Sequence, residues 1–123
     1  MNKRILLIED NPNNRYLVSF LLEARGWQMH HASDGAAGLE LAASCDPAAI
    51  LLDIQLPVMD GHEVARRLKA NPLLSGIPIM AITSFAMQGD REAAIAAGCE
   101  AYMEKPIDPD TFVESVETLL LRA

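Results

Sequence analysis

The stretch AILLD at residues 49–53, followed by IQLPVMDG at residues 54–61, decides the fold of this chain. A continuous apolar run of this length indicates a strand that is buried on both faces, as inside a parallel sheet. Asp53 ends the run, Pro57 and Gly61 mark a loop, and a helical pattern begins beyond them. Ligands of open α/β sheets bind outside the carboxyl ends of the strands, so Asp53 stands where such a fold carries out its chemistry.

A short apolar run followed by a helical pattern occurs five times along the chain. The strands are expected at residues 5–8, 27–32, 49–53, 77–83 and 101–103, each followed by a helix. This alternation predicts a single α/β domain over residues 1–123, with helices on both faces of a five-stranded parallel sheet. Right-handed crossovers and the three continuous apolar runs favour the doubly wound, flavodoxin-like (βα)5 order 2-1-3-4-5. Residues 27–32 alternate in polarity and are therefore expected at an edge.

Helical spacing predicts which faces of the helices are buried. In the first helix, Leu17, Phe20, Leu21 and Ala24 fall on one face, and Gly26 is expected to end the helix. The third helix is expected to bury Val64, Ala65 and Leu68. The fourth, residues 90–97, is short and rich in alanine, so it should be the least firmly held.

Composition excludes several classes of function. The formal net charge of -7 argues against nucleic acid as a direct partner. An apolar run long enough to span a membrane is absent from the sequence, and the first apolar run is too short for a signal peptide, which predicts a cytoplasmic protein without a membrane partner. Cys45 and Cys99 are expected to be free thiols, and His30, His31 and His62 lack the spacing of a zinc site.

Polar residues follow four of the predicted strands at the same edge of the sheet. They are Glu9, Asp10, Asp53, Thr83, Ser84 and Lys105. Three carboxylates placed close together repel one another unless a cation joins them, and oxygen ligands suit magnesium. An aspartate can form an acyl phosphate in covalent catalysis, and phosphoryl transfer otherwise needs alignment and positive charge. Taken singly, each of these residues could have a structural role: capping a turn, interacting favourably with the dipole of the following helix, or lying on the surface in contact with solvent. Their occurrence together at one edge of the sheet favours the functional interpretation.

These residues belong to motifs that resemble the receiver domain of two-component response regulators, the CheY-like superfamily. The motifs are Glu9-Asp10, Leu51-Leu52-Asp53, LPVMDG at 56–61, Ile82-Thr83-Ser84 and Lys105-Pro106, and the resemblance covers essentially the whole chain. The stretch FAMQGD at residues 85–90 is similar to DivK-like single-domain regulators and to receivers of hybrid kinases.

The resemblance implies a role for each residue of the site. Asp53 would accept a phosphoryl group from a phosphohistidine of a histidine kinase or phosphotransferase. Glu9, Asp10, Asp53 and the backbone carbonyl of Gln55 would surround Mg²⁺ or Mn²⁺. Thr83 and Lys105 would contact the phosphoryl oxygens, Tyr102 would be the switch aromatic, and the Lys105–Pro106 peptide would be cis.

The resemblance also implies an output. The chain would catalyse only its own phosphoryl transfer and dephosphorylation, and would switch a protein contact on the face of the fourth helix, fifth strand and fifth helix. It would have no DNA-binding output domain. One departure from the family pattern is Ser84, where Ala or Gly is usual, and this puts the rates of phosphorylation and dephosphorylation in doubt.

Three alternatives compete with this interpretation, and the sequence argues against the first. A phosphatase of the dehalogenase type carries a second Asp two residues after its nucleophile, but here that residue is Gln55. A pseudo-receiver would keep the fold as a binding module without accepting phosphate. The chain could also be a receiver cut from a longer hybrid kinase or regulator. The sequence names neither the kinase nor the downstream partner, nor the oligomeric state.

Overall fold

Five strands and five helices alternate along the chain in the computed structural model, which describes residues 2–84 and 89–121. The strands are β1 (Arg4–Ile8), β2 (Gln28–Ala32), β3 (Ala49–Asp53), β4 (Ile79–Thr83) and β5 (Ala101–Glu104). The helices are α1 (Pro12–Glu23), α2 (Gly35–Cys45), α3 (Gly61–Ala70), α4 (Asp90–Ala96) and α5 (Pro109–Leu121). The strands form one parallel sheet in the order β2-β1-β3-β4-β5, which confirms the predicted doubly wound fold.

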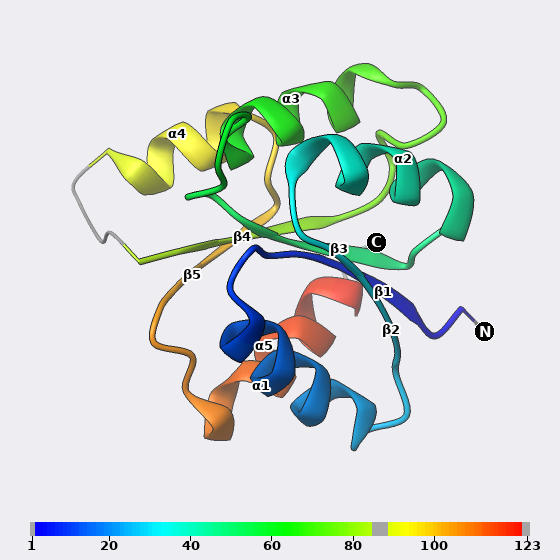
Figure 1. Ribbon diagram of the computed structural model, residues 1–123, viewed down its shortest axis with the longest axis vertical. Coiled ribbons are helices and arrows are strands. Elements are labelled where there is room, and N and C mark those ends of the chain that lie inside the picture. The colour runs from blue at the N-terminus through cyan, green and yellow to red at the C-terminus, as the bar shows by residue number, and fades with distance from the viewer. Residues whose placement is uncertain (1, 85–88, 122–123) are drawn as a thin grey trace.

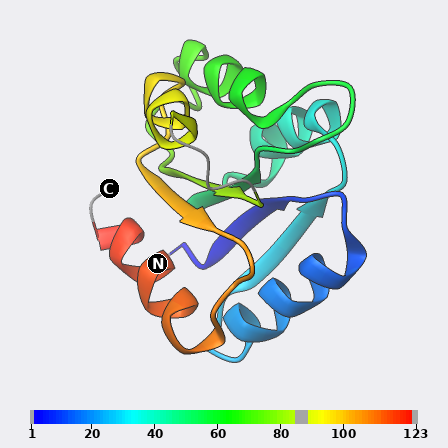
Figure 2. The ribbon, with the colours of Figure 1, turned by 90° about the vertical axis from the view of Figure 1, so that its left-hand side faces the viewer.

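The helices cover both faces of the sheet. Figures 1 and 2 show α2, α3 and α4 on one face, and α1 and α5 on the other. Successive side chains of a strand point to opposite faces, so β1 divides its residues between two cores. Leu6 and Ile8 pack beneath α2 and α3, whereas Ile5 and Leu7 pack against α1 and α5.

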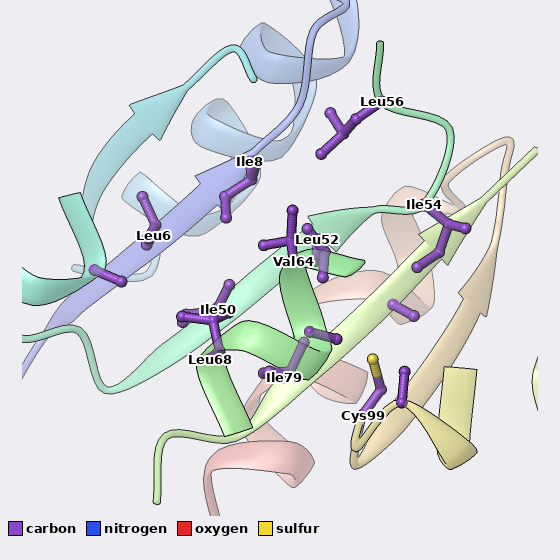
Figure 3. Packing of buried hydrophobic residues seen from close by; sticks show 14 of the residues in the cluster. Leu6, Ile8, Ile50, Leu52, Ile54, Leu56, Val64, Leu68, Ile79 and Cys99 are labelled. Carbon is purple, nitrogen blue, oxygen red and sulfur yellow. The ribbon is translucent and has the colours of Figure 1, made fainter. Parts of the chain in front are cut away.

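The third helix confirms its predicted packing. Val64, Ala65 and Leu68 are buried, and Figure 3 shows Val64 and Leu68 lying over Leu52 and Ile50 of β3. Every residue of β3 and β4 is buried, as their apolar sequences predict. The edge strand β2 is mostly exposed or half-buried, as its alternating pattern predicts.

The predicted buried face of α1 is wrong. The buried residues are Val18, Ser19 and Leu22, whereas Phe20 is 61% exposed and stacks on Tyr16 with ring centroids 6.3 Å apart. Leu17 and Leu21 are only partly buried and Ala24 is exposed. Apolar side chains occur almost all round this helix, so its spacing fits two faces equally well. Contact with β2 and α5 decides between these two faces.

Gly26 ends α1 as expected, and Gly98 ends α4 in the same way. At Gly26 the backbone has φ +90°, and the N–H of Trp27 donates to the carbonyl of Leu22 at 3.2 Å. At Gly98, with φ +106°, the N–H of Cys99 donates in the same way to Ala94 at 3.0 Å. This is the Schellman arrangement, in which a residue with positive φ satisfies the last free carbonyls of a helix.

Two strand starts differ slightly from the prediction. β2 begins at Gln28 rather than Trp27, and β4 begins at Ile79 rather than Ile77. Among residues 2–84 and 89–121, the helices all lack the length and apolar character that crossing a lipid bilayer requires.

Candidate functional site

Three carboxylates meet at the carboxyl ends of β1 and β3. Glu9 and Asp10 follow β1 directly, and Asp53 is the last residue of β3. One oxygen from each lies within 4.8 Å of the other two. Glu9 and Asp53 are only 2% exposed, whereas Asp10 is open to solvent. Figure 2 views this edge of the sheet, where the loops that follow the strands lie.

This donor set fits a hard divalent cation. Carboxylate oxygens are the ligands that Mg²⁺ uses in proteins, and Mg²⁺ usually keeps several waters. One exposed carboxylate beside two buried ones leaves such a site open on the side of the solvent. Without a cation, three carboxylates in a partly desolvated site destabilise one another.

The start of α1 holds Glu9 in place. The side chain of Asn11 caps the helix by accepting hydrogen bonds from the backbone N–H groups of Asn13 and Asn14. The backbone N–H of Asn11 in turn donates to a carboxylate oxygen of Glu9 at 3.2 Å. Arg15, one turn further on, donates to the backbone carbonyl of Glu9 at 2.9 Å. The sequence Asn-Pro after the acidic pair therefore has two roles: it starts α1, and it orients the carboxylate of Glu9.

Gly61 lets α3 begin directly against the end of β3. A Cβ atom on Gly61 would lie 2.6 Å from the carbonyl oxygen of Asp53 and 2.6 Å from the Cα of Ile54. The backbone N–H of Gly61 donates to the carbonyl of Ile54 at 2.9 Å, and the side chain of Asp60 caps the helix. Only a residue without a side chain fits here, because both neighbouring atoms belong to the backbone.

Lys105 supplies positive charge to the same site from the end of β5. Its Nζ lies 2.8 Å from Oε1 of Glu9 and 3.3 Å from Oδ2 of Asp53, and the side chain is 12% exposed. The peptide bond between Lys105 and Pro106 is cis, the geometry that the resemblance implies. The backbone N–H of Lys105 donates to the carbonyl of Thr83 at 2.7 Å, which ties the lysine loop to β4.

The charges of this site shift the pKa values of two of its members. Burial, followed by the hydrogen bond with Asp53, raises the pKa of Glu9 to about 7, although Lys105 acts in the opposite direction. Burial alone would lower the pKa of Lys105, but its hydrogen bond to Glu9 and the charge of Asp53 outweigh this effect and raise the pKa. The lysine therefore stays charged at neutral pH, while metal-free Glu9 titrates near neutrality.

Thr83 ends β4 and is almost completely buried. Its hydroxyl accepts a hydrogen bond from the side-chain amide of Gln55, whose side-chain oxygen accepts one from the backbone N–H of Ser84 at 2.8 Å. The backbone N–H of Gln55 donates to Oδ1 of Asp53 at 2.9 Å. The resemblance implied a role only for the backbone carbonyl of Gln55, and a loop side chain carries no periodic signal of its direction.

Tyr102 lies apart from the carboxylates. It is half-buried in β5, where it pairs with Ala81 of β4, and it lines a cavity with Arg91, Ile95 and Glu100. The structure thus gathers the three predicted carboxylate ligands and Lys105 at one point, with Thr83 at the end of the neighbouring strand and Tyr102 further back along the sheet. Of the stretch 85–90, residues 85–88 lie outside the described part of the chain.

Comparison with known proteins agrees with this arrangement. The family model of the response regulator receiver domain matches residues 5–117. The chain is 42% identical over 120 residues to the polar-differentiation response regulator DivK of Brucella ovis and of Brucella anthropi, covering 98% of this chain and 98% of each relative.

Solved structures show the same architecture. A putative response regulator from Chloroflexus aurantiacus superposes with a TM-score of 0.94 at 25% identity, covering 99% of this chain and 100% of that one. The receiver domain of the sensor histidine kinase PA1611 from Pseudomonas aeruginosa superposes with a TM-score of 0.85 at 34% identity, covering 99% and 97%. That structure has a magnesium ion coordinated in its active site cleft.

Proposed function

This chain belongs to the response regulator receiver family, and from that membership we propose that it is a magnesium-dependent phosphoryl acceptor that is modified on Asp53. The donor is a phosphohistidine of a histidine kinase or histidine phosphotransferase, as for the two-component systems to which the family belongs. The observation that carries the proposal is the single cluster of Asp53, Glu9, Asp10 and Lys105 at the carboxyl ends of the strands.

In the proposed reaction a carboxylate oxygen of Asp53 forms a bond to phosphorus as the bond between phosphorus and the histidine nitrogen breaks. The product is an acyl phosphate, and the imidazole of the donor leaves. The protein contributes alignment and charge rather than acid–base chemistry. Burial of Asp53 among fixed groups keeps its carboxylate in place, because Gln55 holds one oxygen and Lys105 pairs with the other.

Glu9, Asp10, Asp53 and the backbone carbonyl of Gln55 are the proposed ligands of Mg²⁺ or Mn²⁺. Bound there, the cation supplies positive charge to the oxygens of the phosphoryl group. Lys105 contributes a second positive charge from the loop that follows β5. The hydroxyl of Thr83 is a hydrogen-bond donor for a phosphoryl oxygen. These assignments are supported by the burial of Thr83 and Lys105 beside Asp53.

The proposed product is a signal rather than a metabolite. A phosphoryl group adds negative charge and acceptor oxygens to the site, and the proposed response is a change in the surface formed by α4, β5 and α5, to which a downstream protein binds. We infer no direct contact with nucleic acid, since the net charge is -7. A phosphohistidine donor and two free thiols are consistent with the cytoplasm as the place of action.

Incubation with acetyl phosphate and Mg²⁺ tests this function directly. Intact-mass spectrometry should show one added phosphoryl group in the wild type, and none in Asp53→Asn or in the presence of EDTA. Asp34→Asn is the matched control, because Asp34 is an exposed acid that follows β2 at the same edge and caps α2; it should be labelled like the wild type. Equal labelling of Asp53→Asn would reject the assignment, and no labelling of any variant would favour a pseudo-receiver.

A further inference from the structure

The side chain of Gln55 lies across the end of β4. Its Nε2 donates to Oγ1 of Thr83, and its Oε1 accepts from the backbone N–H of Ser84 at 2.8 Å. A planar carboxamide thus contacts two consecutive residues, while the backbone N–H of the same residue contacts the buried carboxylate of Asp53. The loop from β3 to α3 is connected in this way to the end of β4 by a side chain as well as by the sheet.

The direction of these hydrogen bonds follows from chemistry. A backbone N–H can only donate, so the carboxamide oxygen must face Ser84 and the amide nitrogen must face Thr83. The amide nitrogen can only donate, so the hydroxyl oxygen of Thr83 accepts this bond. The carboxamide of Gln55 therefore occupies one lone pair of the Thr83 hydroxyl and the N–H of Ser84, which has no second hydrogen to donate.

We propose that the carboxamide of Gln55 is an internal occupant of the phosphoryl-binding position, which must leave the N–H of Ser84 before that group can bind a phosphoryl group on Asp53. The inference rests on the proposed function, because it concerns the same site. The carboxamide oxygen takes the hydrogen bond from Ser84 that a phosphoryl oxygen would accept. Gln55 is a positioning residue here, since it sets the availability of the Ser84 N–H and does not react.

Exchange of one occupant for the other is favourable in the phosphorylated state. An ionised phosphoryl oxygen is a stronger acceptor than a neutral carboxamide oxygen. The side chain of Gln55, which is only partly buried, then moves towards solvent and leaves the N–H of Ser84 to the phosphoryl group. In the unphosphorylated state the carboxamide satisfies the N–H of Ser84 and keeps the end of β4 close to the β3–α3 loop.

The backbone of Gln55 links this exchange to the nucleophile. Its N–H donates to Oδ1 of Asp53 at 2.9 Å. The residue that orients the phosphoryl acceptor is therefore the one that occupies the position of the phosphoryl oxygens. A substitution of the side chain leaves this backbone contact in place, so the two roles can be separated by mutation.

Beryllofluoride, a mimic of the phosphoryl group, provides the test. The variant Gln55→Met keeps the length of the side chain and removes both hydrogen bonds. Gln28→Met is the matched control, because Gln28 is exposed on the edge strand β2. Binding of beryllofluoride in saturating Mg²⁺ is measured by NMR titration of ¹⁵N-labelled protein. We expect Gln55→Met to bind about fivefold more tightly than the wild type, the factor that one net hydrogen bond gives, and Gln28→Met to bind like the wild type.

The NMR signals of two groups report on the occupant itself. In the unliganded wild type the side-chain NH₂ group of Gln55 should exchange slowly with water, and beryllofluoride should make its exchange fast. The amide resonance of Ser84 should shift in unliganded Gln55→Met and stay unchanged in Gln28→Met. A side chain that served only to support the loop would not change the affinity for beryllofluoride in this direction.

The possible failures are distinguishable. If the wild type and both variants bind beryllofluoride with equal affinity, the proposed function stands and the inference about Gln55 is wrong. Weaker binding by Gln55→Met has the same meaning. If none of the proteins binds beryllofluoride with Mg²⁺, the proposed function fails and the inference fails with it.

Discussion

The ammonium group of Lys105 lies 2.8 Å from a carboxylate oxygen of Glu9, and both side chains are almost completely buried. The two residues come from β5 and β1, on opposite sides of β3 and β4 in the sheet. Lys105 therefore acts as the counter-ion of the acidic cluster in the metal-free protein. Removing one partner of a buried ion pair leaves an uncompensated charge, which typically costs ~3–5 kcal/mol.

We expect Lys105→Met to lower the free energy of unfolding in EDTA, by less than this amount because Glu9 can bind a proton instead. Added Mg²⁺ should recover most of the loss, since a ligand that binds only the folded state stabilises it by mass action. Urea unfolding with and without Mg²⁺ measures both effects. Lys3→Met is the control, because Lys3 lies over Trp27 and away from the cluster. A loss that Mg²⁺ does not reduce would show that Lys105 acts through packing alone.

The raised pKa of Glu9 predicts a specific dependence of stability on pH. Its usual value of 4.5 rises to about 7 in the folded protein, chiefly through burial and then through Asp53. The folded state therefore binds this proton more tightly than the unfolded chain does. The resulting stabilisation is fully present below the unfolded pKa and is lost as the pH rises through about 7.

In EDTA, the stability of the wild type relative to Glu9→Gln should accordingly fall between about pH 5 and 8. With Mg²⁺ the fall should be smaller, because the cation prefers the ionised carboxylate. Urea unfolding of the two proteins across this range, with and without Mg²⁺, gives the comparison. A difference that is independent of pH in EDTA would contradict the raised pKa.

Gly61 offers a test of how the nucleophile is positioned. Gly61→Ala places a methyl group against two backbone atoms of Asp53 and Ile54, so it should destabilise the fold by about 1–3 kcal/mol, as overpacking does, and slow phosphorylation by acetyl phosphate. Gly76→Ala is the matched control, since no atom lies within 4 Å of a Cβ at that position. It should change stability by less than about 0.5 kcal/mol and leave the phosphorylation rate unchanged. Equal effects of the two substitutions would mean that the loop can move away from Asp53.

The sequence was sufficient for the topology because the apolar runs are unambiguous. The strand over residues 49–53 has the predicted bounds, and α3 begins at Gly61, where the loop was expected to give way to a helix. Residues of the receiver-domain motifs, such as Asp53 and Lys105, were predicted to lie together because the carboxyl ends of parallel strands meet at one edge of the sheet. The resemblance also supplied the cis peptide, which composition and spacing do not encode.

Two features could not be predicted, for physical reasons. The rotation of α1 depends on contacts with β2 and α5, and apolar residues on most sides of the helix, including the exposed Phe20, gave no preference. The side-chain direction of Gln55 depends on the conformation of the loop after β3 and on the end of β4, which are distant in sequence. Both are tertiary effects that local spacing does not carry.

The fourth helix is the element that we expect to respond to phosphorylation. It has seven residues, and Gly89 at its N-terminus provides no side-chain hydrogen bond as a cap. Its C-terminal connection is held firmly, because Lys69 pairs with Glu100 at 2.6 Å and Glu100 accepts from the backbone N–H of Ile79 at 2.8 Å. Motion should therefore concentrate at the N-terminal end of the helix, which we expect to unfold locally at a lower free energy than the rest of the fold.

Hydrogen exchange with and without beryllofluoride and Mg²⁺ tests this expectation. Protection should change within the range 83–104 and hardly at all in α2, whose first turn is capped by Asp34.

Movement of Thr83 towards the phosphoryl group would vacate space beneath α4. Tyr102 packs against the same core and is placed to fill that space. Tyr102→Ala should accordingly reduce the change in protection across α4 while phosphorylation of Asp53 persists. A ligand shifts such an equilibrium only through its different affinity for the two states, so a partner that prefers the phosphorylated surface should also prolong the phosphorylated state. If the protection changes map to α1 instead, the surface of α4, β5 and α5 is not the output of this protein.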